Sequence, residues 1–301
     1  MERTASESMV VDSVQMRIGD IAEAELDQLH ALSIAVGWPH RAEDWQFLRR
    51  VGKGVVAMDD IGRVLGSAMW FPHGGNFATV GMVITSPRLQ ANGTGRWLMQ
   101  HAFARLAGYT LGLNATRAAR RLYLSLGFAA EKIVYQCQGE AHEPGPPGAT
   151  PDGAHLRAID IADLALLAEL DRQAYGADRM PVLAGLLKHS KGFGLFRNDR
   201  LDAFSLCRPF GRGHVIGPVV ANGDQDAIAV IRPHVSEHAG HFLRLDTRQK
   251  DGAFAAFLSR CGMPVFDTVT TMSLGKRWIP EDSLIPEARP MTYALASQAL
   301  G

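Results

Sequence analysis

Hydrophobic positions along the first half of the chain follow helix and strand periods in turn. Continuous or alternating apolar runs predict strands at residues 15–17, 55–58, 64–71, 78–85, 111–113 and 133–138. Apolar stripes spaced three to four residues apart predict helices at 20–33, 45–51, 95–107 and 116–126, the first opened by Asp20 as N-cap and Glu23 as its N3 acid. This order of elements predicts a mixed α/β unit.

Four segments of this first half recur in the second half, in the same order. The matched pairs begin at Arg17 and Arg157, Lys53 and Lys191, Val80 and Ile216, and Leu122 and Phe257. The offset decreases slowly from 140 to 135 residues, as expected for a duplicated domain with small deletions.

Residues 139–154 separate the two copies. Four prolines and four glycines in these sixteen positions disfavour both a helix and a central strand. We therefore predict a first domain at 1–138, a linker at 139–154 and a second domain at 155–301. A long surface loop within one domain is the alternative, although such loops are uncommon.

Composition and charge narrow the possible partners. The 301 residues carry 31 Lys and Arg against 31 Asp and Glu, so no basic excess favours nucleic acid. Three widely spaced cysteines without a C-x-x-C pair argue against a disulfide scaffold or structural zinc. With no visible signal peptide or apolar run of about 20 residues, we expect a cytoplasmic protein without membrane partners.

The segment 85–96 (TSPRLQANGTGR) is the sharpest local feature, because it follows an apolar strand and opens a helix. Gly93 and Gly95 allow close approach of the backbone to a ligand, and amides at a helix N-terminus favour an anion such as pyrophosphate. The segment lacks the Walker pattern and the third glycine of a dinucleotide fingerprint. It fits the pattern Q/R-x-x-G-x-G/A from Gln90 to Gly95.

This loop resembles the coenzyme A pyrophosphate loop of the GNAT (GCN5-related) N-acetyltransferase superfamily. Residues 116–128 (TRAARRLYLSLGF) resemble the superfamily's N-x-x-A-x-x-L-Y-x-x-x-G-F motif, with Thr116 in place of asparagine. The run 113–116 (LNAT) resembles the L-D-A-T variant of tandem-GNAT proteins of the YitH-like type, whose second acetyltransferase-like domain is divergent. The resemblance covers nearly the whole chain and implies two tandem GNAT-like domains, each a mixed, mostly antiparallel twisted sheet flanked by helices.

The second copy departs from the cofactor pattern. At an offset of 136, Gln90, Gly93 and Gly95 correspond to Asp226, Ala229 and Ile231; at 135, Tyr123 corresponds to Leu258. We therefore expect one cofactor site per chain, and a second domain that shapes the acceptor pocket or stabilises the first. We expect a monomer, which would be an internal pseudo-dimer, or a homodimer.

The resemblance implies transfer of an acetyl group from acetyl-CoA to a primary amine of a small molecule or peptide, without a metal. The implied site residues are the general acid Tyr123, the thioester-polarising amides of Val83, Ile84 and Thr85, and the coenzyme-binding positions Gln90, Ala91, Asn92, Gly93, Thr94, Gly95, Arg96 and Thr116. A phenol that only packs on its helix is the alternative for Tyr123.

The base that deprotonates the amine is not evident. The strands 78–85 and 109–114 hold no acid, so His40, His73, Asp44 or a water chain remain as candidates. A non-catalytic acyl-CoA-binding or regulatory module is therefore an alternative function, as is transfer of a different acyl group.

Other patterns carry weaker hypotheses. His234, His238 and His241 could include a zinc pair on a helix, but Pro233 and Gly240 make a regular helix doubtful, and a solvated polar stretch is favoured. Trp38, Trp45 and Trp70 could line an acceptor pocket or pack in the core. Arg117, Arg120 and Arg121 could contact the phosphates of the coenzyme or face solvent.

Overall fold

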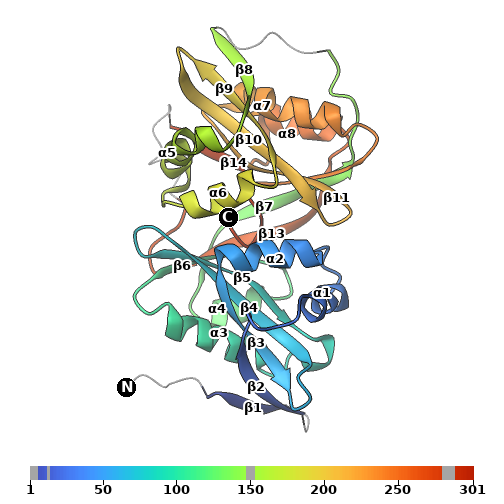
Figure 1. Ribbon diagram of the computed structural model, residues 1–301, viewed down its shortest axis with the longest axis vertical. Helices are drawn as coiled ribbons and strands as arrows, with labels where there is room; N and C mark the ends of the chain where they lie inside the picture. Colours follow the sequence, from blue (N-terminus) through green and yellow to red (C-terminus); the bar gives the residue numbers. More distant parts are fainter. Residues whose placement is uncertain (1–5, 12–13, 147–152, 280–288) are drawn as a thin grey trace.

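The computed structural model describes residues 6–11, 14–146, 153–279 and 289–301. Two lobes are stacked along the long axis, each a twisted sheet with helices packed on it, and the C-terminus lies between them (Figure 1). In the described residues, no helix is both long and apolar enough to cross a membrane.

The first half contains β1 (Ser8–Val11), β2 (Val14–Asp20), α1 (Leu26–Ala35), α2 (Ala42–Val51), β3 (Lys53–Asp59), β4 (Val64–His73), β5 (Phe77–Thr85), η1 (Pro87–Leu89), α3 (Thr94–Arg105), β6 (Thr110–Ala115), α4 (Arg120–Ser125) and β7 (Ala129–Glu140). The second contains β8 (Ala154–Ile159), η2 (Ile161–Asp163), α5 (Leu164–Tyr175), α6 (Met180–Leu187), β9 (Lys191–Arg197), β10 (Arg200–Phe210), β11 (Gly213–Ala221), α7 (Asp224–Glu237), β12 (Phe242–Thr247), α8 (Gly252–Arg260), β13 (Val265–Leu274) and β14 (Met291–Ala294).

Every strand and helix predicted in the first half is present, with two changes at helix starts. Asp20 does not cap a helix: its Oδ1 accepts the Ala22 N–H at 2.8 Å in a turn, and α1 begins only at Leu26. The last predicted helix is shorter, because residues 116–119 form a turn before α4 begins at Arg120.

The duplication is confirmed element by element. From β2 to β7 and from β8 to β13 the order is the same, and all four matched sequence pairs lie on corresponding elements. The predicted linker 139–154 is too long at both ends, because Gly139 and Glu140 belong to β7 and Ala154 begins β8. Residues 141–146 and 153 lie outside helix and strand, and 147–152 lie outside the described residues.

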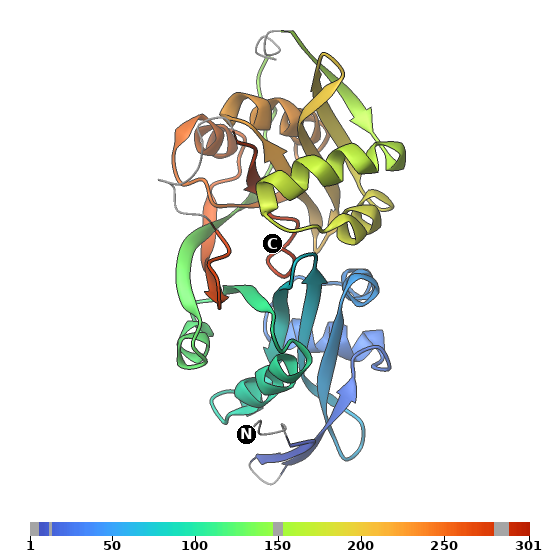
Figure 2. The same ribbon diagram turned by 90° about the vertical axis from the view of Figure 1, so that its left-hand side faces the viewer.

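The last strands of the two halves are exchanged. β13 pairs with β6 of the first half, and β7 pairs with β12 of the second, while β7 and β13 pair with each other. The described strands thereby form one sheet in the order β1-β2-β3-β4-β5-β6-β13-β7-β12-β11-β10-β9-β8. Figure 2 shows β7 and β13 running together between the lobes. The fold class is confirmed: among the described pairings, only β5 with β6 and β11 with β12 are parallel.

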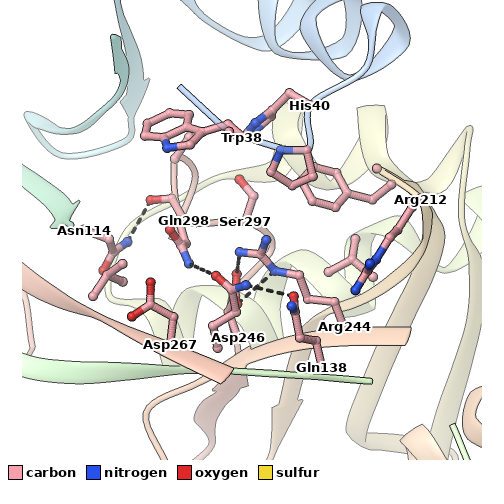
Figure 3. A pocket seen from close by; sticks show the side chains of 18 of the residues that line it. Trp38, His40, Asn114, Gln138, Arg212, Arg244, Asp246, Asp267, Ser297 and Gln298 are labelled. Carbon is pink, nitrogen blue, oxygen red and sulfur yellow. Dashed lines mark hydrogen bonds and ion pairs between the residues drawn. The ribbon is translucent and has the colours of Figure 1, made fainter. Parts of the chain in front are cut away.

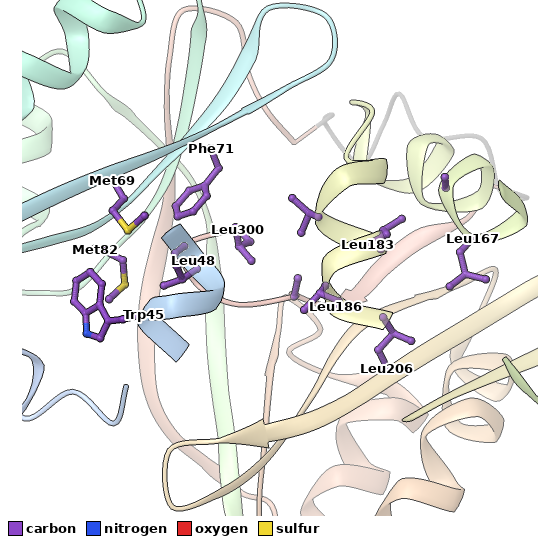
Figure 4. Close-up of a cluster of buried hydrophobic side chains, with 14 of the residues drawn as sticks. Trp45, Leu48, Met69, Phe71, Met82, Leu167, Leu183, Leu186, Leu206 and Leu300 are labelled. Atoms are coloured by element: carbon purple, nitrogen blue, oxygen red, sulfur yellow. The ribbon is translucent and has the colours of Figure 1, made fainter. Parts of the chain in front are cut away.

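A hydrophobic core also spans the two halves. One cluster joins Trp45 and Phe71 of the first half to Leu183 and Leu206 of the second, with Leu300 between them (Figure 4). Burial of apolar surface on this scale favours a fixed arrangement of the two halves.

Candidate functional site

The predicted coenzyme loop is a tight, exposed turn. Residues 90–93 connect η1 to α3, and Ala91 and Gly93 both have positive φ, at 68° and 86°. Gly93 occupies the N-cap position of α3, and in the described residues no side chain caps that helix. The start of this twelve-residue helix can therefore offer backbone N–H groups to an anion.

Close packing against α4 supports this loop from behind. A Cβ on Gly95 would lie 3.1 Å from Cδ2 of Leu122, and Arg96 donates from Nη2 to Ser125 Oγ at 2.6 Å. Thr94 is fully buried, so ligand contacts predicted for the loop fall to its exposed neighbours, Gln90 to Gly93 and Arg96. The loop residues fit a pyrophosphate.

Next to the loop, one edge of β5 has no partner strand. β6 pairs with β5 only from Phe77 to Thr79, so the described strands leave the β6-facing edge of residues 83–85 open. A bulge precedes this edge: Met82 has φ 50°, and Ser67 Oγ donates to its carbonyl at 2.7 Å. The predicted thioester amides of Val83, Ile84 and Thr85 thus lie on a strand that diverges from its neighbour.

In the second half the corresponding edge is filled. β11 pairs with β12 only at His214 and Val215, but β14 pairs with Val219, Val220 and Ala221. These three residues correspond to Val83, Ile84 and Thr85 at the offset of 136. The chain's own C-terminal strand therefore occupies the position that a thioester would need.

The helix start in the second half is also unsuited to an anion. Asp224 Oδ1 accepts the Tyr293 hydroxyl of β14 at 3.0 Å, and Asp226 pairs with Arg197 at 2.7 Å. Two carboxylates in the first turn of α7 repel a pyrophosphate. Together with β14, they support a single cofactor site in the first half.

Tyr123 lies on α4 in the core of the first half. It is 6% exposed, its ring contacts Phe128 edge-on with centroids 5.8 Å apart, and burial raises the pKa of its phenol above the usual value. A phenol in this environment remains protonated at neutral pH, as a general acid must.

A cavity of about 650 Å³ lies where the two halves meet. The first half contributes the bulge at Gly81 and Met82, and Trp38 and His40 from the segment between α1 and α2 (Figure 3). The other lining residues include Asn114, Thr116, Gln136, Gln138, Arg208, Phe210, Arg212, Phe242, Arg244, Asp246, Asp267, Ser297, Gln298 and Ala299. Its size is typical of sites for small molecules.

The C-terminal segment forms part of this cavity wall. Asn114 Nδ2 donates to the Gln298 carbonyl at 2.8 Å, and Gln298 Nε2 donates to Gln136 Oε1 at 3.3 Å. A Cβ on Gly81 would lie 2.6 Å from Cβ of Ala299, so the segment packs directly on the bulge. The second half thus shapes the cavity through β13 as well as this segment.

Two family models match the chain, at residues 51–130 and 167–284, and both are described as an acetyltransferase (GNAT) domain. The chain belongs to the GNAT superfamily, with tandem domains. No curated protein matches it.

Solved structures show the same tandem GNAT fold at low sequence identity. A candidate acetyltransferase from Pyrococcus horikoshii aligns at 17% identity with a TM-score of 0.74, over 98% of this chain and 99% of that one. A GCN5-related N-acetyltransferase from Sphaerobacter thermophilus aligns at 18% identity and TM-score 0.62, over 88% and 96%. A tandem GNAT protein from the clavulanic acid biosynthesis pathway aligns at 15% identity and TM-score 0.60, over 87% and 99%.

In this GNAT structure, the three base candidates occupy different environments. His40 lines the cavity, and burial lowers its pKa to about 4, so its ring is neutral at pH 7. His73 lies in a separate cluster beside Phe77 and Tyr175, where burial lowers its pKa to about 3. Asp44 lies in the first turn of α2, where its carboxylate accepts the backbone N–H of the N-cap residue Arg41 and pairs with the Arg41 guanidinium at 3.1 Å. Of the three, His40 alone lines the cavity.

Several cavity residues were missed by the sequence prediction. Arg208 lies in the otherwise buried apolar strand β10, which is a local signal, since an arginine among core residues needs a reason. Arg244 carries the same signal, because it lies between buried leucines in β12. Gln298 carries no such signal, because its position in the cavity depends on the path of the C-terminal segment.

The remaining tryptophan, threonine and arginine candidates lie in different places. Trp38 lines the cavity, whereas Trp45 and Trp70 pack in cores. Thr116 also lines the cavity, and its Oγ1 accepts the Ala119 N–H at 3.3 Å. Arg117 donates to Thr268 of β13 at 3.3 Å.

The histidine pattern in the second half differs from the prediction. α7 continues regularly through Pro233, and His234 is fully buried, with Nε2 3.1 Å from Ser205 Oγ. The expected solvated stretch is therefore wrong for His234. In the described residues no group of His, Cys, Asp or Glu is arranged to hold a metal ion.

Burial of His234 has a consequence for acid stability. Burial lowers its pKa to about 4, with the nearby His238 acting in the same direction, so below pH 6.5 the unfolded chain binds a proton that the folded chain does not. The neutral His234 therefore stabilises the folded chain fully above pH 6.5. As the pH falls to 4, up to about 3 kcal/mol of this contribution to the free energy of unfolding is lost. Urea unfolding of His234→Gln should show a shallower loss over this range, and the exposed control His241→Gln should match the wild type.

Proposed function

We propose that this protein transfers the acetyl group of acetyl-CoA to a primary amine, using one coenzyme site in its first half. The open edge of β5 at residues 83–85 carries the proposal, because it lies between the glycine loop and the cavity. Acyl transfer needs backbone donors near the thioester carbonyl, and this edge can provide them.

Each part of the site has a distinct task in this proposal. Amides of the exposed loop residues, from Gln90 to Gly93 and at Arg96, hold the pyrophosphate, and Thr116 lies at the cavity wall. Acetyl-CoA supplies the activated acyl group. Amides among Val83, Ile84 and Thr85 donate to the carbonyl oxygen, which gains negative charge in the transition state.

The transfer balances as one bond formed and one broken. The neutral amine nitrogen attacks the carbonyl carbon, a C–N bond forms, the C–S bond breaks, and the thiolate takes the proton of the Tyr123 phenol. The amine nitrogen in turn releases a proton, which can restore the phenol through water. His40, with a pKa of about 4, is too weak a base to deprotonate an ammonium efficiently at pH 7. We therefore propose that the amine equilibrates with bulk solvent through water in the cavity, and that its neutral fraction attacks.

A thiol-release assay with acetyl-CoA over a panel of amines, with mass spectrometry of the products, tests this function. We expect stoichiometric formation of free CoA and an N-acetylated amine. Tight binding of acetyl-CoA without product over the whole panel would instead indicate a non-catalytic acyl-CoA-binding module. Faster turnover with another acyl-CoA would identify that acyl-CoA as the donor and would still support acyl transfer to an amine.

A further inference from the structure

Arg208 is a buried cation without an ionic partner. It is 7% exposed and lines the cavity, and no carboxylate in the described part of the chain forms a salt bridge with it. Its one hydrogen bond among the described residues runs from Nη2 to the Ala296 carbonyl at 3.0 Å, while Nε is buried without a partner. A buried guanidinium that lacks an anion destabilises the fold, so its presence here needs a functional reason, such as binding an anionic ligand.

Neighbouring carboxylates are already engaged. Asp246 accepts from Arg244 through both oxygens, at 3.1 and 2.8 Å, and Asp44 pairs with Arg41 at the start of α2. Burial lowers the pKa of Arg208 to about 10; the charge of Asp44 opposes this shift, whereas those of Arg244 and Arg41 act in the same direction as burial. The Arg208 guanidinium is still protonated at neutral pH. An incoming anion would offset both the cost of burying this charge and its repulsion by the neighbouring arginines.

Aromatic rings hold the guanidinium in place. Its Cζ lies 5.9 Å from the ring centre of Phe47 and 5.3 Å from that of Phe210. Phe210 also contacts Arg244 at 5.5 Å and His40 edge-on at 5.2 Å. A fixed, planar fork of N–H donors matches a carboxylate in a bidentate geometry.

The cavity connects this cation to the proposed site of transfer. Its wall runs from Gly81 and Met82 at the β5 bulge to Arg208 and Phe210 in the second half. We propose that the acceptor is an amino carboxylate whose carboxylate binds Arg208 and whose amine faces the β5 bulge at Gly81 and Met82, on the other wall of the same cavity. This inference rests on the proposed function, since it names the substrate class of the same site.

The rest of the lining agrees with this class. The charged lining residues are three arginines, at 208, 212 and 244, and two aspartates, at 246 and 267. A polyamine or aminoglycoside would be repelled by this excess of positive charge. The rings of Trp38, Phe210 and Phe242 favour an apolar side chain on the acceptor.

Paired acceptors test the inference. Phenylalanine and leucine are compared with phenethylamine and isoamylamine, which lack the carboxylate. We expect kcat/KM to be on the order of 100-fold higher for the amino acids, because a buried polar site rejects an analogue that leaves it unpaired. Arg208→Met should abolish this preference and leave the thermal stability equal or higher, since it removes an unpaired buried charge.

The exposed Arg212 lines the same cavity, with its guanidinium 4.0 Å from the ring centre of Phe242, and provides a matched control. Arg212→Met should change the preference by no more than about threefold, as an exposed charge contributes little. Equal use of amines and amino acids, or an unchanged preference in Arg208→Met, would overturn the inference while leaving acetyl transfer established.

A binding measurement separates this inference from the proposed function. Calorimetry of N-acetylphenylalanine and N-acetylphenethylamine, in the presence of CoA, needs no turnover. Arg208-dependent binding of the acid alone would support carboxylate recognition even if no amine on the panel were acetylated. Equal or undetectable binding of both compounds would contradict it.

Discussion

Replacement of Tyr123 by phenylalanine should lower kcat by about 10²–10⁴-fold and leave the dissociation constant of acetyl-CoA within about twofold. The phenol is buried on α4, and burial raises its pKa, so it is protonated at neutral pH before the thiolate forms. Phenylalanine keeps the ring packing against Phe128 and removes only the donor. Steady-state kinetics with acetyl-CoA, together with calorimetry of acetyl-CoA binding, measures both quantities.

Tyr109→Phe is the matched control, because Tyr109 packs against the same core cluster as Tyr123. Its kcat should equal that of the wild type. If Tyr123→Phe retained full kcat, the phenol would be a packing group and another donor would protonate the thiolate.

Replacement of Asp171 by alanine should destabilise the protein by about 3–5 kcal/mol, since it leaves Arg179 as an uncompensated buried charge. The two side chains are 1% and 0% exposed, and Arg179 donates from Nε and Nη2 to the carboxylate at 2.7 and 2.9 Å. The same guanidinium donates from Nη1 to the carbonyls of Leu300 and Gly301, so it also fixes the C-terminal segment. Urea unfolding at pH 7 measures the effect.

Glu169→Ala removes a carboxylate from the same helix, where Glu169 pairs with Arg172 and both side chains are 55% exposed. The urea midpoint of this control should stay close to that of the wild type, because an exposed ion pair contributes little to stability. The double variant Asp171→Leu with Arg179→Met should recover part of the loss, because it removes both charges. Equal urea midpoints for Asp171→Ala and the wild type would contradict a structural role of the pair.

Local sequence patterns were sufficient to predict the loop and the elements of the first half from β2 to β7, whereas β1 was missed. The apolar runs at β3, β4 and β5 determine strands by their own composition, and Gly93 marks a positive φ that other residues adopt with strain. The duplication could be detected because corresponding elements bury the same faces in both halves.

Pairing between distant strands could not be predicted in the same way. β7 and β13 are equivalent strands of the two copies. The apolar pattern of a strand indicates that it belongs to a sheet, but it does not specify which strand it pairs with. The exchange decides which residues meet in the cavity, so Gln136 and Asp267 became visible as cavity residues only in three dimensions. The same holds for β14, whose pairing with β11 depends on the path of the C-terminal segment.

We propose a single coenzyme site in the first half, with β14 filling the corresponding edge of the second half. Calorimetric titration with acetyl-CoA tests it most directly, using the wild type, Gly93→Val and Gly108→Val. Both glycines have positive φ, at 86° and 81°, and they flank opposite ends of α3, so the backbone strain is matched. We expect one acetyl-CoA per chain, with binding weakened at least about tenfold by Gly93→Val and unchanged by Gly108→Val. Two equivalents per chain, no binding, or equal affinity in Gly93→Val would contradict it.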